Sequence, residues 1–463
     1  MAHLKGNLDR MAATTSETMP IVLGLKGLDD TVIVIGAGAA GLAAADALGR
    51  RGVRVVVLEK EPRIAEPWRR RHEKLTLNTH RALSALPGLA YPPRTAAFPN
   101  KDAIVGYLED FARARGIRVE FGTAVERIER RGNGWLVHTG RETLSARNVI
   151  VATGRDRLPW TPDWQGKATF TGKLIHAADF GTAQDYVGKS VLVVGAGNSG
   201  FDVLNHLARA DTKAICLSAR QGPSLMPKRI GKVAVARFGG FMAMLPTWIA
   251  DAAIAATQRL VFGDLARFGL PPAPKGGASR LGVEQIAIAV DDGAVAALKA
   301  GRISVVAPVA AFEGAGVRLN DGTVLEPDVV IAATGYRTGL EAMLGDLGVL
   351  DAKGVPKANG GTPSGQPGLW FIGMRPSLTS YFHSAGLQAE AIARQIAKGV
   401  VDERFWTENH RALRAAAVAR TGGSTHLQDG IEYPGDWAKR HPVVIHGRSK
   451  ERSDAAHTRG SMP

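Results

Sequence analysis

Two glycine-rich turns of the same kind stand where a dinucleotide could bind. The sequence GAGAAG occupies residues 36–41 after the apolar run TVIVI, and GAGNSG occupies residues 195–200 after SVLVV. Between a strand and a helix, such a turn offers backbone N–H groups and a helix N-terminus to a pyrophosphate. One such motif is weak evidence in a chain with 55 glycines. Two in this context predict that two dinucleotides bind at once.

The residue 23 positions after the first glycine of each turn differs between the two copies. It is Glu59 in the first copy and Ser218 in the second, where Arg220 follows. A carboxylate accepts hydrogen bonds from ribose hydroxyls and repels a 2′-phosphate, whereas a hydroxyl and a guanidinium would hold that phosphate. The first site is therefore predicted to take an adenosine with free ribose hydroxyls, and the second to prefer NADPH to NADH. The alternative is that Arg220 is a solvated loop residue.

The surroundings of the two turns repeat one order of elements. Each turn is followed by a helical stretch (43–48 and 201–207), a strand and several short strands, and each block ends in a buried strand with the sequence Ala-Thr-Gly (152–154 and 333–335). This order indicates an internal duplication at the scale of a domain. The predicted fold class is α/β, with two Rossmann-like dinucleotide-binding domains.

Composition excludes several classes of site. Cys216 is the single cysteine among 463 residues, so one chain forms no disulfide and no cysteine metal site, and a cytoplasmic location is expected. The 12 histidines show no metal-ligand spacing, so no metal is expected, and no G-x-S-x-G elbow supports a hydrolase. The net charge is +15, but the basic residues are scattered apart from 69–71, so nucleic-acid binding is not expected.

The longest apolar stretch, 239–262, is not predicted to span a membrane. Pro246, Asp251 and Arg259 interrupt it. A buried or lid helix is expected there, and a segment at a membrane surface is the alternative.

Further segments resemble a known family. Residues 170–180, FTGKLIHAADF, resemble the F-x-G-x-x-x-H-x-x-x-(Y/F) signature of class B flavin-containing monooxygenases. Residues 68–80 (WRRRHEKLTLNTH), 86–92 (LPGLAYP) and 225–231 (LMPKRIG) resemble stretches of the plant YUCCA branch, the indole-3-pyruvate monooxygenases, and its bacterial relatives. Together with the glycine turns, the resemblance covers about residues 30–400.

Three positions distinguish this chain within the resemblance. Phe180 stands where the related Baeyer–Villiger enzymes have Trp, and Glu66-Pro67 replaces the Gly-Gly that usually precedes Trp68, so the local backbone must differ. Asn78 stands where the plant enzymes usually have His, and Asn is typical of members that oxygenate soft nucleophiles.

The resemblance implies an FAD domain into which an NADPH domain is inserted. Its last FAD element would be a strand ending at Gly373, followed by a helix over 386–398 whose N-terminus points at the flavin. The expected parts are a flexible leader (1–30), the FAD-binding domain (31–160 and 331–400), the inserted NADPH-binding domain (161–330), and a C-terminal cap and disordered tail (401–463).

The activity implied by the resemblance is that of an FAD- and NADPH-dependent monooxygenase. NADPH reduces FAD, O₂ adds at flavin C4a, and the resulting (hydro)peroxide oxygenates a small organic substrate. That substrate is an N or S nucleophile or an aryl 2-oxo acid such as indole-3-pyruvate. The alternatives are an NADPH oxidase or diaphorase-type flavin reductase, and a regulatory subunit that binds FAD and NADPH without turnover. The expected partners are the substrate and O₂, with a homodimer possible.

Two residues are candidates for the chemistry. The Asn78 amide could donate to a peroxy oxygen and accept from the nicotinamide amide, unless it serves only loop backbone groups. His176 could act in acid–base catalysis, although a structural role linked to NADPH binding is the favoured interpretation. The predicted cofactor-binding residues are Gly36, Gly38, Ala39, Ala40, Gly41, Glu59, Lys60, Trp68, Asn78, Thr153, Gly154, Gly195, Gly197, Asn198, Ser199, Gly200, Ser218, Arg220, Thr334, Gly335, Gly373 and Leu387.

Overall fold

The first sheet of the computed structural model, which describes residues 31–345 and 347–399, is parallel and has five strands in the order β22-β7-β1-β2-β3. The expected leader and C-terminal tail lie outside the described residues. The strands are β1 (Thr31–Ile35), β2 (Arg54–Leu58), β3 (Val119–Glu120), β7 (Asn148–Val151) and β22 (Leu369–Phe371).

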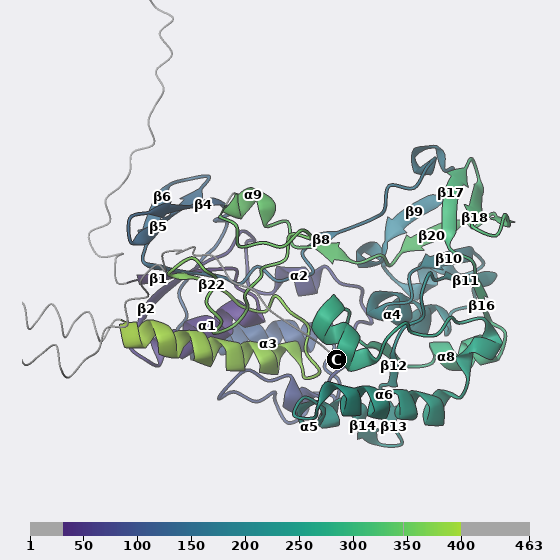
Figure 1. Ribbon diagram of the computed structural model, residues 1–463, viewed down its shortest axis with the longest axis horizontal. Helices are drawn as coiled ribbons and strands as arrows, with labels where there is room; N and C mark the ends of the chain where they lie inside the picture. Colours follow the sequence, from purple (N-terminus) through teal and green to yellow (C-terminus); the bar gives the residue numbers. More distant parts are fainter. Residues whose placement is uncertain (1–30, 346, 400–463) are drawn as a thin grey trace, which may run out of the picture. The chain divides into compact units, whose positions relative to one another are not determined.

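Both faces of this sheet are covered (Figure 1). Because side chains alternate along a strand, Val32 and Val34 face one layer while Ile33 and Ile35 face the other, which explains the continuous apolar run of β1. The first layer holds α1 (Ala39–Gly49), α3 (Lys101–Ala114) and a helix over residues 381–399. The second holds the antiparallel strands β4 (Val125–Arg131), β5 (Gly134–Thr139) and β6 (Thr143–Ala146), with α9 (Glu341–Leu344).

The second parallel sheet repeats this plan in the order β16-β11-β10-β20-β9. Its strands are β9 (Lys173–His176), β10 (Ser190–Val194), β11 (Ala214–Ser218), β16 (Ile303–Val306) and β20 (Val329–Ala332). One face packs on α4 (Asn198–Leu207) and α8 (Ala294–Lys299), and the other on β17 (Val309–Glu313), β18 (Gly316–Leu319) and β19 (Val324–Leu325). The predicted fold class is therefore confirmed.

The two glycine turns have the same backbone geometry. Gly36 N–H donates to the Leu58 carbonyl at 2.8 Å, and Gly195 N–H donates to the Ser218 carbonyl at 2.9 Å. The φ angles of Gly36 and Gly195 are +107° and +113°, a region that favours glycine. The duplicated sequence has thus produced a duplicated turn.

The chain between β11 and β16 contains several further helices and short strands besides α8. It contains β12 (Leu225–Pro227), β13 (Arg229–Ile230), β14 (Val233–Ala234), β15 (Ala289–Asp291), α5 (Gly239–Met242), α6 (Thr247–Phe262), α7 (Gly277–Ser279) and a π-helix (Arg280–Glu284). The same segment holds the 3₁₀ turns Val235–Phe238 and Leu265–Phe268. Short elements outside it are α2 (Glu66–Arg69), β8 (Leu158–Pro159), β21 (Tyr336–Arg337) and the 3₁₀ turns Arg81–Leu83, Lys167–Thr169, Ala177–Asp179 and Ala183–Tyr186.

Pro246 divides the apolar stretch 239–262, as its ring predicts, and α6 begins at the next residue. Trp248 is 72% exposed, and only Ala250, Ile254 and Phe262 of α6 are buried. Of the expected buried or lid helix, the buried helix is therefore wrong for most of the surface of α6, and the lid helix stays a prediction. Among the described residues, no helix combines the length and the apolar character that crossing a membrane requires.

The last helix begins at residue 381, not at 386 as predicted. Ser380 directly precedes it, and its hydroxyl accepts a hydrogen bond from Phe382 N–H at 3.2 Å, as a capping side chain does. Gly386 lies inside the helix, where a Cβ atom would stand 2.8 Å from a ring carbon of Pro87. This glycine therefore marks a close packing contact and not the start of the helix.

The close approach at the first turn gives a testable expectation. A Cβ atom on Gly41 would lie 1.9 Å from the Gly36 carbonyl oxygen, so a Gly41→Ala variant must shift the backbone. We expect it to lower the free energy of unfolding by roughly 1–3 kcal/mol. Gly49→Ala in the same helix is the control, because its Cβ meets nothing within 4 Å. Chemical denaturation measures both variants, and equal stabilities would contradict the close-packing argument.

Candidate active site

A cavity of about 1310 Å³ opens beside the first glycine turn. Its wall includes apolar side chains from the segment after β11, among them Met226, Phe238 and Phe241. Of the residues predicted to hold cofactors, the wall contains Gly36, Gly38, Ala39, Ala40, Glu59, Lys60, Trp68, Asn78, Thr153, Gly154, Asn198 and Gly373. Those that do not line it are Gly41, Gly195, Gly197, Ser199, Gly200, Ser218, Arg220, Thr334, Gly335 and Leu387.

The first turn fits a dinucleotide. A Cβ atom added to Gly38 would meet nothing within 4 Å, so this position keeps open space beside the N-terminus of α1. The Glu59 carboxylate accepts hydrogen bonds from Ala37 N–H at 2.6 Å and Glu61 N–H at 3.0 Å. These bonds fix the carboxylate at the end of β2, where an acid binds ribose hydroxyls. The residues present could therefore hold a flavin dinucleotide.

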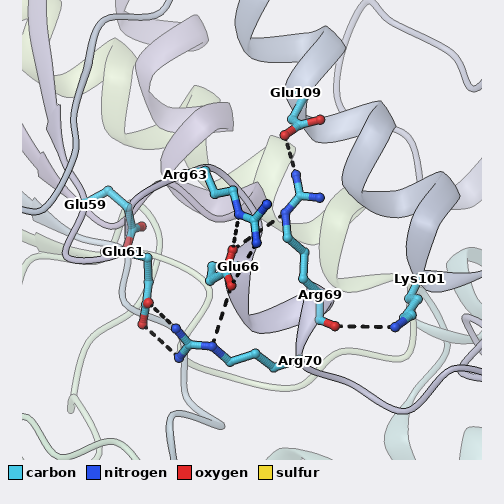
Figure 2. A network of polar contacts seen from close by, with 8 residues as sticks. All are labelled: Glu59, Glu61, Arg63, Glu66, Arg69, Arg70, Lys101 and Glu109. Carbon is cyan, nitrogen blue, oxygen red and sulfur yellow. Dashed lines mark hydrogen bonds and ion pairs between the residues drawn. The ribbon is translucent and has the colours of Figure 1, made fainter.

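A network of ion pairs holds α2, the helix that carries Trp68, against α3 and the loop that follows β2 (Figure 2). Glu66 accepts from Arg63 Nε at 2.6 Å, and the Arg63 guanidinium lowers the pKa of this carboxyl group. Further pairs join Arg70 to Glu61 and Arg69 to Glu109, on α3, and Lys101 Nζ donates to the Arg69 carbonyl. The network fixes the backbone beside one wall of the cavity.

The Glu66-Pro67 departure has a local structural consequence. Ala65, the residue before α2, has a φ angle of +61°, in the left-handed region that non-glycine residues seldom adopt. The helix then starts with Glu66 and Pro67, and proline is well tolerated there. Trp68 packs edge-on against Phe382 at 6.2 Å between ring centroids. The tryptophan thus joins α2 to the last helix.

The second turn also leaves space for a ligand, but its two predicted phosphate ligands differ. A Cβ atom on Gly197 would meet nothing within 4 Å. Ser218 is buried, and its hydroxyl donates to the Ala307 carbonyl at 2.9 Å, whereas Arg220 is exposed. The serine proton is therefore already used within the protein, and recognition of a 2′-phosphate would depend on the arginine.

The part of the chain around the first parallel sheet and the part around the second, called here its two halves, meet at Asn78. Its Nδ2 donates to Asn198 Oδ1 at 3.2 Å, and Asn198 is the first residue of α4. A second cavity, of about 720 Å³, lies on the other side, and Thr76, Asn78 and Lys228 line both cavities. These three polar residues form the partition between the two cavities.

Sequence reasoning missed the part played by Lys228, although it lies within the segment 225–231. Its ammonium group donates to Thr76 Oγ1 at 2.8 Å and to Asp292 Oδ2 at 3.3 Å. Burial lowers the pKa of Lys228 below its ordinary value of 10.5. A buried cation in a largely apolar cavity is suited to an anionic group of a ligand.

His176 lies away from the cavity wall and forms two hydrogen bonds. Its Nδ1 accepts from Ala178 N–H at 3.0 Å, and its Nε2 lies 3.0 Å from the Gly335 carbonyl, to which the Nε2–H tautomer donates. Burial lowers the pKa of His176, which favours the neutral ring. These contacts favour the structural interpretation of this histidine.

The other predicted residues occupy varied positions. Thr334 Oγ1 donates to the Trp160 carbonyl at 2.5 Å, and Gly373 N–H donates to Gln388 Oε1 at 2.9 Å. Leu387 is 61% exposed, and because the helix begins at residue 381 it stands in the second turn and away from the cavity. The structure does not bring Leu387 to the cavity, and the cofactor-binding role expected of it stays a prediction.

Comparison with known proteins gives consistent results. A family model described as pyridine nucleotide-disulphide oxidoreductase matches residues 33–228. The chain is 33% identical over 352 residues to "Indole-3-pyruvate monooxygenase YUCCA1" of Oryza sativa subsp. japonica, covering 74% of this chain and 86% of that protein.

Solved structures share the fold. A flavin-containing monooxygenase from Stenotrophomonas maltophilia aligns with a TM-score of 0.61 and 23% identity over 80% of this chain and 99% of its own. OTEMO in complex with FAD and NADP aligns with a TM-score of 0.61 and 19% identity over 81% of this chain and 85% of its own.

The unequal positions of Ser218 and Arg220 lead to a prediction. Arg220→Ala should lower the ratio of NADPH to NADH efficiency by about 10- to 100-fold, because a hydrogen bond to a charged group contributes about 1.5–3 kcal/mol. Ser218→Ala should change the ratio much less, since its hydroxyl donates to Ala307. Arg318→Ala is the control, as this half-buried arginine of β18 pairs with Glu313. Steady-state kinetics with both nucleotides measures the ratio, and an unchanged value in Arg220→Ala would refute the assignment.

Proposed function

Because the chain belongs to the flavin-containing monooxygenase family of the plant indole-3-pyruvate monooxygenases, we propose that its substrate is an aryl 2-oxo acid such as indole-3-pyruvate. The chain is an oxidoreductase that uses FAD and NADPH, and O₂ is its co-substrate. Relatives that are monooxygenases favour this activity over the flavin reductase and the regulatory subunit that the sequence left open.

The observation that carries the proposal is the partition formed by Thr76, Asn78 and Lys228. It places an amide and a buried ammonium group at the wall of a cavity that also contains apolar and aromatic side chains. An aryl 2-oxo acid carries an apolar ring at one end and a carboxylate at the other. We assign the ring to the apolar wall near Met226 and Phe241, and the carboxylate to Lys228.

The cofactor supplies the redox chemistry: FAD reduced by NADPH activates O₂, so that one oxygen atom enters the substrate and the other leaves as water. Overall, R–CO–COOH, O₂, NADPH and H⁺ give R–COOH, CO₂, NADP⁺ and H₂O. The task of the chain is to bind, to orient and to exclude water. Lys228 holds the carboxylate, and the Asn78 amide donates a hydrogen bond toward the reacting oxygen. The apolar wall limits the entry of water.

In this proposal each cofactor binds to the part of the chain around one of the two parallel sheets. We assign FAD to residues 31–160 and 331–400, with Glu59 on the ribose, and NADPH to residues 161–330, with Arg220 on the 2′-phosphate. β20 belongs wholly to the second sheet, although the expected boundary at residue 330 falls inside it. The expected cytoplasmic location and homodimer stay predictions from the sequence.

A soft N or S nucleophile is a second candidate substrate, because Asn78 stands where the plant enzymes usually have His. The buried Lys228 argues against a cationic amine, since it would repel that charge.

The test is a substrate panel with the FAD-loaded protein. Aryl 2-oxo acids, amines and thioethers are each supplied with NADPH and O₂, and product, CO₂ and H₂O₂ are measured. We expect CO₂ and the acid shortened by one carbon from the 2-oxo acid, in proportion to the NADPH consumed. Oxygenation of amines or thioethers without decarboxylation of any 2-oxo acid would overturn the proposed substrate.

The assignment of Lys228 predicts both a substitution effect and a pH effect. Lys228→Gln should raise KM for the 2-oxo acid by about 10- to 100-fold. In the unmodified protein, KM should rise as the pH increases toward 10.5, because the lowered pKa makes Lys228 lose its proton early. In Lys228→Arg this rise should disappear, since a guanidinium stays charged.

The control for Lys228 is Lys232→Gln, because Lys232 is exposed and does not line the cavity. NADPH-dependent reduction of the bound flavin, measured without substrate, checks that the variants are intact. A Lys228→Gln variant with an unchanged KM would contradict the carboxylate site.

A further inference from the structure

Three potential metal ligands meet where the loop after α2 contacts α4. His72 Nε2 lies 2.9 Å from Asp202 Oδ2, and His206 Nε2 lies 3.8 Å from Asp202 Oδ1. Asp202 and His206 are four residues apart, so they project from the same side of α4, whereas His72 comes from the other half of the chain. The ligand atoms all lie within 4.8 Å of one another.

These separations are close to those of a tetrahedral zinc site. Zn²⁺ binds imidazole nitrogen at about 2.0–2.1 Å and carboxylate oxygen at about 2.0–2.2 Å, so neighbouring ligand atoms lie about 3.3 Å apart. The observed 2.9 Å to Asp202 Oδ2 and 3.8 Å to Asp202 Oδ1 lie on either side of this value, although they involve different oxygens of the carboxylate. Two histidines and one aspartate leave the fourth position for water. The side chains must rotate before one Asp202 oxygen and both imidazole nitrogens surround a single ion.

A neighbouring aromatic side chain positions His72, and a cavity gives an ion access to the cluster. The buried Phe180 packs edge-on against His72, with ring centroids 5.6 Å apart. The His72 side chain is 7% exposed, whereas Asp202 and His206 line the cavity of about 720 Å³. One side of the cluster is therefore fixed by packing, and the other opens to a space through which a hydrated ion can enter.

Two cations near the cluster share a second carboxylate, that of Asp292. Lys228 Nζ lies 3.3 Å from Asp292 Oδ2, and Arg209 Nη2 lies 3.6 Å from the same atom. Together with the Asp202 carboxylate, these four groups carry no net charge when the imidazoles are neutral. Among the three proposed ligands, Asp202 is the one whose side chain carries a negative charge.

We propose that His72, Asp202 and His206 form a Zn²⁺ site that joins the loop carrying Asn78 to the helix that follows the second glycine turn. The sequence alone does not reveal this site, since 130 residues separate His72 from Asp202. Binding through Nε2 places the proton of His72 on Nδ1, and the ion replaces the hydrogen bond to Asp202. The ion stabilises the contact between the two halves, because it binds the folded chain and not the separated ligands.

The test uses the untagged, FAD-loaded full chain, with Zn²⁺ in calorimetry and Co²⁺ in visible absorption spectroscopy. We expect one Zn²⁺ per chain, a higher melting temperature with Zn²⁺, and Co²⁺ d–d bands of tetrahedral intensity. His72→Ala, Asp202→Asn and His206→Ala should each weaken Zn²⁺ binding by at least about 100-fold. Flavin content and circular dichroism establish that each variant is folded.

His138→Ala is the matched control, because His138 pairs with Glu129 at 3.1 Å on a surface strand and has no part in the cluster. It should bind Zn²⁺ as the unmodified chain does. The proposal is overturned if the unmodified chain binds no stoichiometric Zn²⁺, or if folded ligand variants bind it equally well. Either result would define the three residues as a hydrogen-bonded contact between the halves and no more.

Discussion

The structure depends on two places where a helix and a strand approach without a side chain between them. At Gly41 and at Gly200 an added Cβ would lie 1.9 Å from the carbonyl oxygen of Gly36 and of Gly195, respectively. This approach brings the first turn of each helix to the carboxyl end of its own strand, where a pyrophosphate binds. The open space at Gly38 and Gly197 lies beside the same two turns.

The two copies share a backbone and differ in their chemistry. Glu59 directly follows the second strand of the first copy, and two backbone N–H groups hold its carboxylate. In the second copy, Ser218 is buried and bonded to Ala307, and only Arg220 reaches solvent. One plan therefore serves two nucleotides, and the chemistry of oxygen transfer is assigned to the place where the copies meet, at Asn78 and Asn198.

The sequence predicted those features that depend on residues close together along the chain. The glycine turns, the buried strands and the break at Pro246 follow from backbone geometry and apolar periodicity, so the sequence was sufficient for them. The partition was not predictable, because Lys228 meets Thr76 across 152 residues. The start of the last helix was missed because Gly386 serves packing against Pro87, and the orientation of Ser218 depended on a distant carbonyl group.

The central claim is that Asn78, held by Asn198 across the two halves, directs activated oxygen to the substrate. The most direct measurement is the amount of oxygenated product and of H₂O₂ formed per NADPH in Asn78→Ala, with the exposed Asn320→Ala as control. Loss of one hydrogen bond predicts about a threefold to tenfold fall in product, with a matching rise in H₂O₂ and an unchanged rate of flavin reduction. An unchanged ratio of product to H₂O₂ would contradict the account.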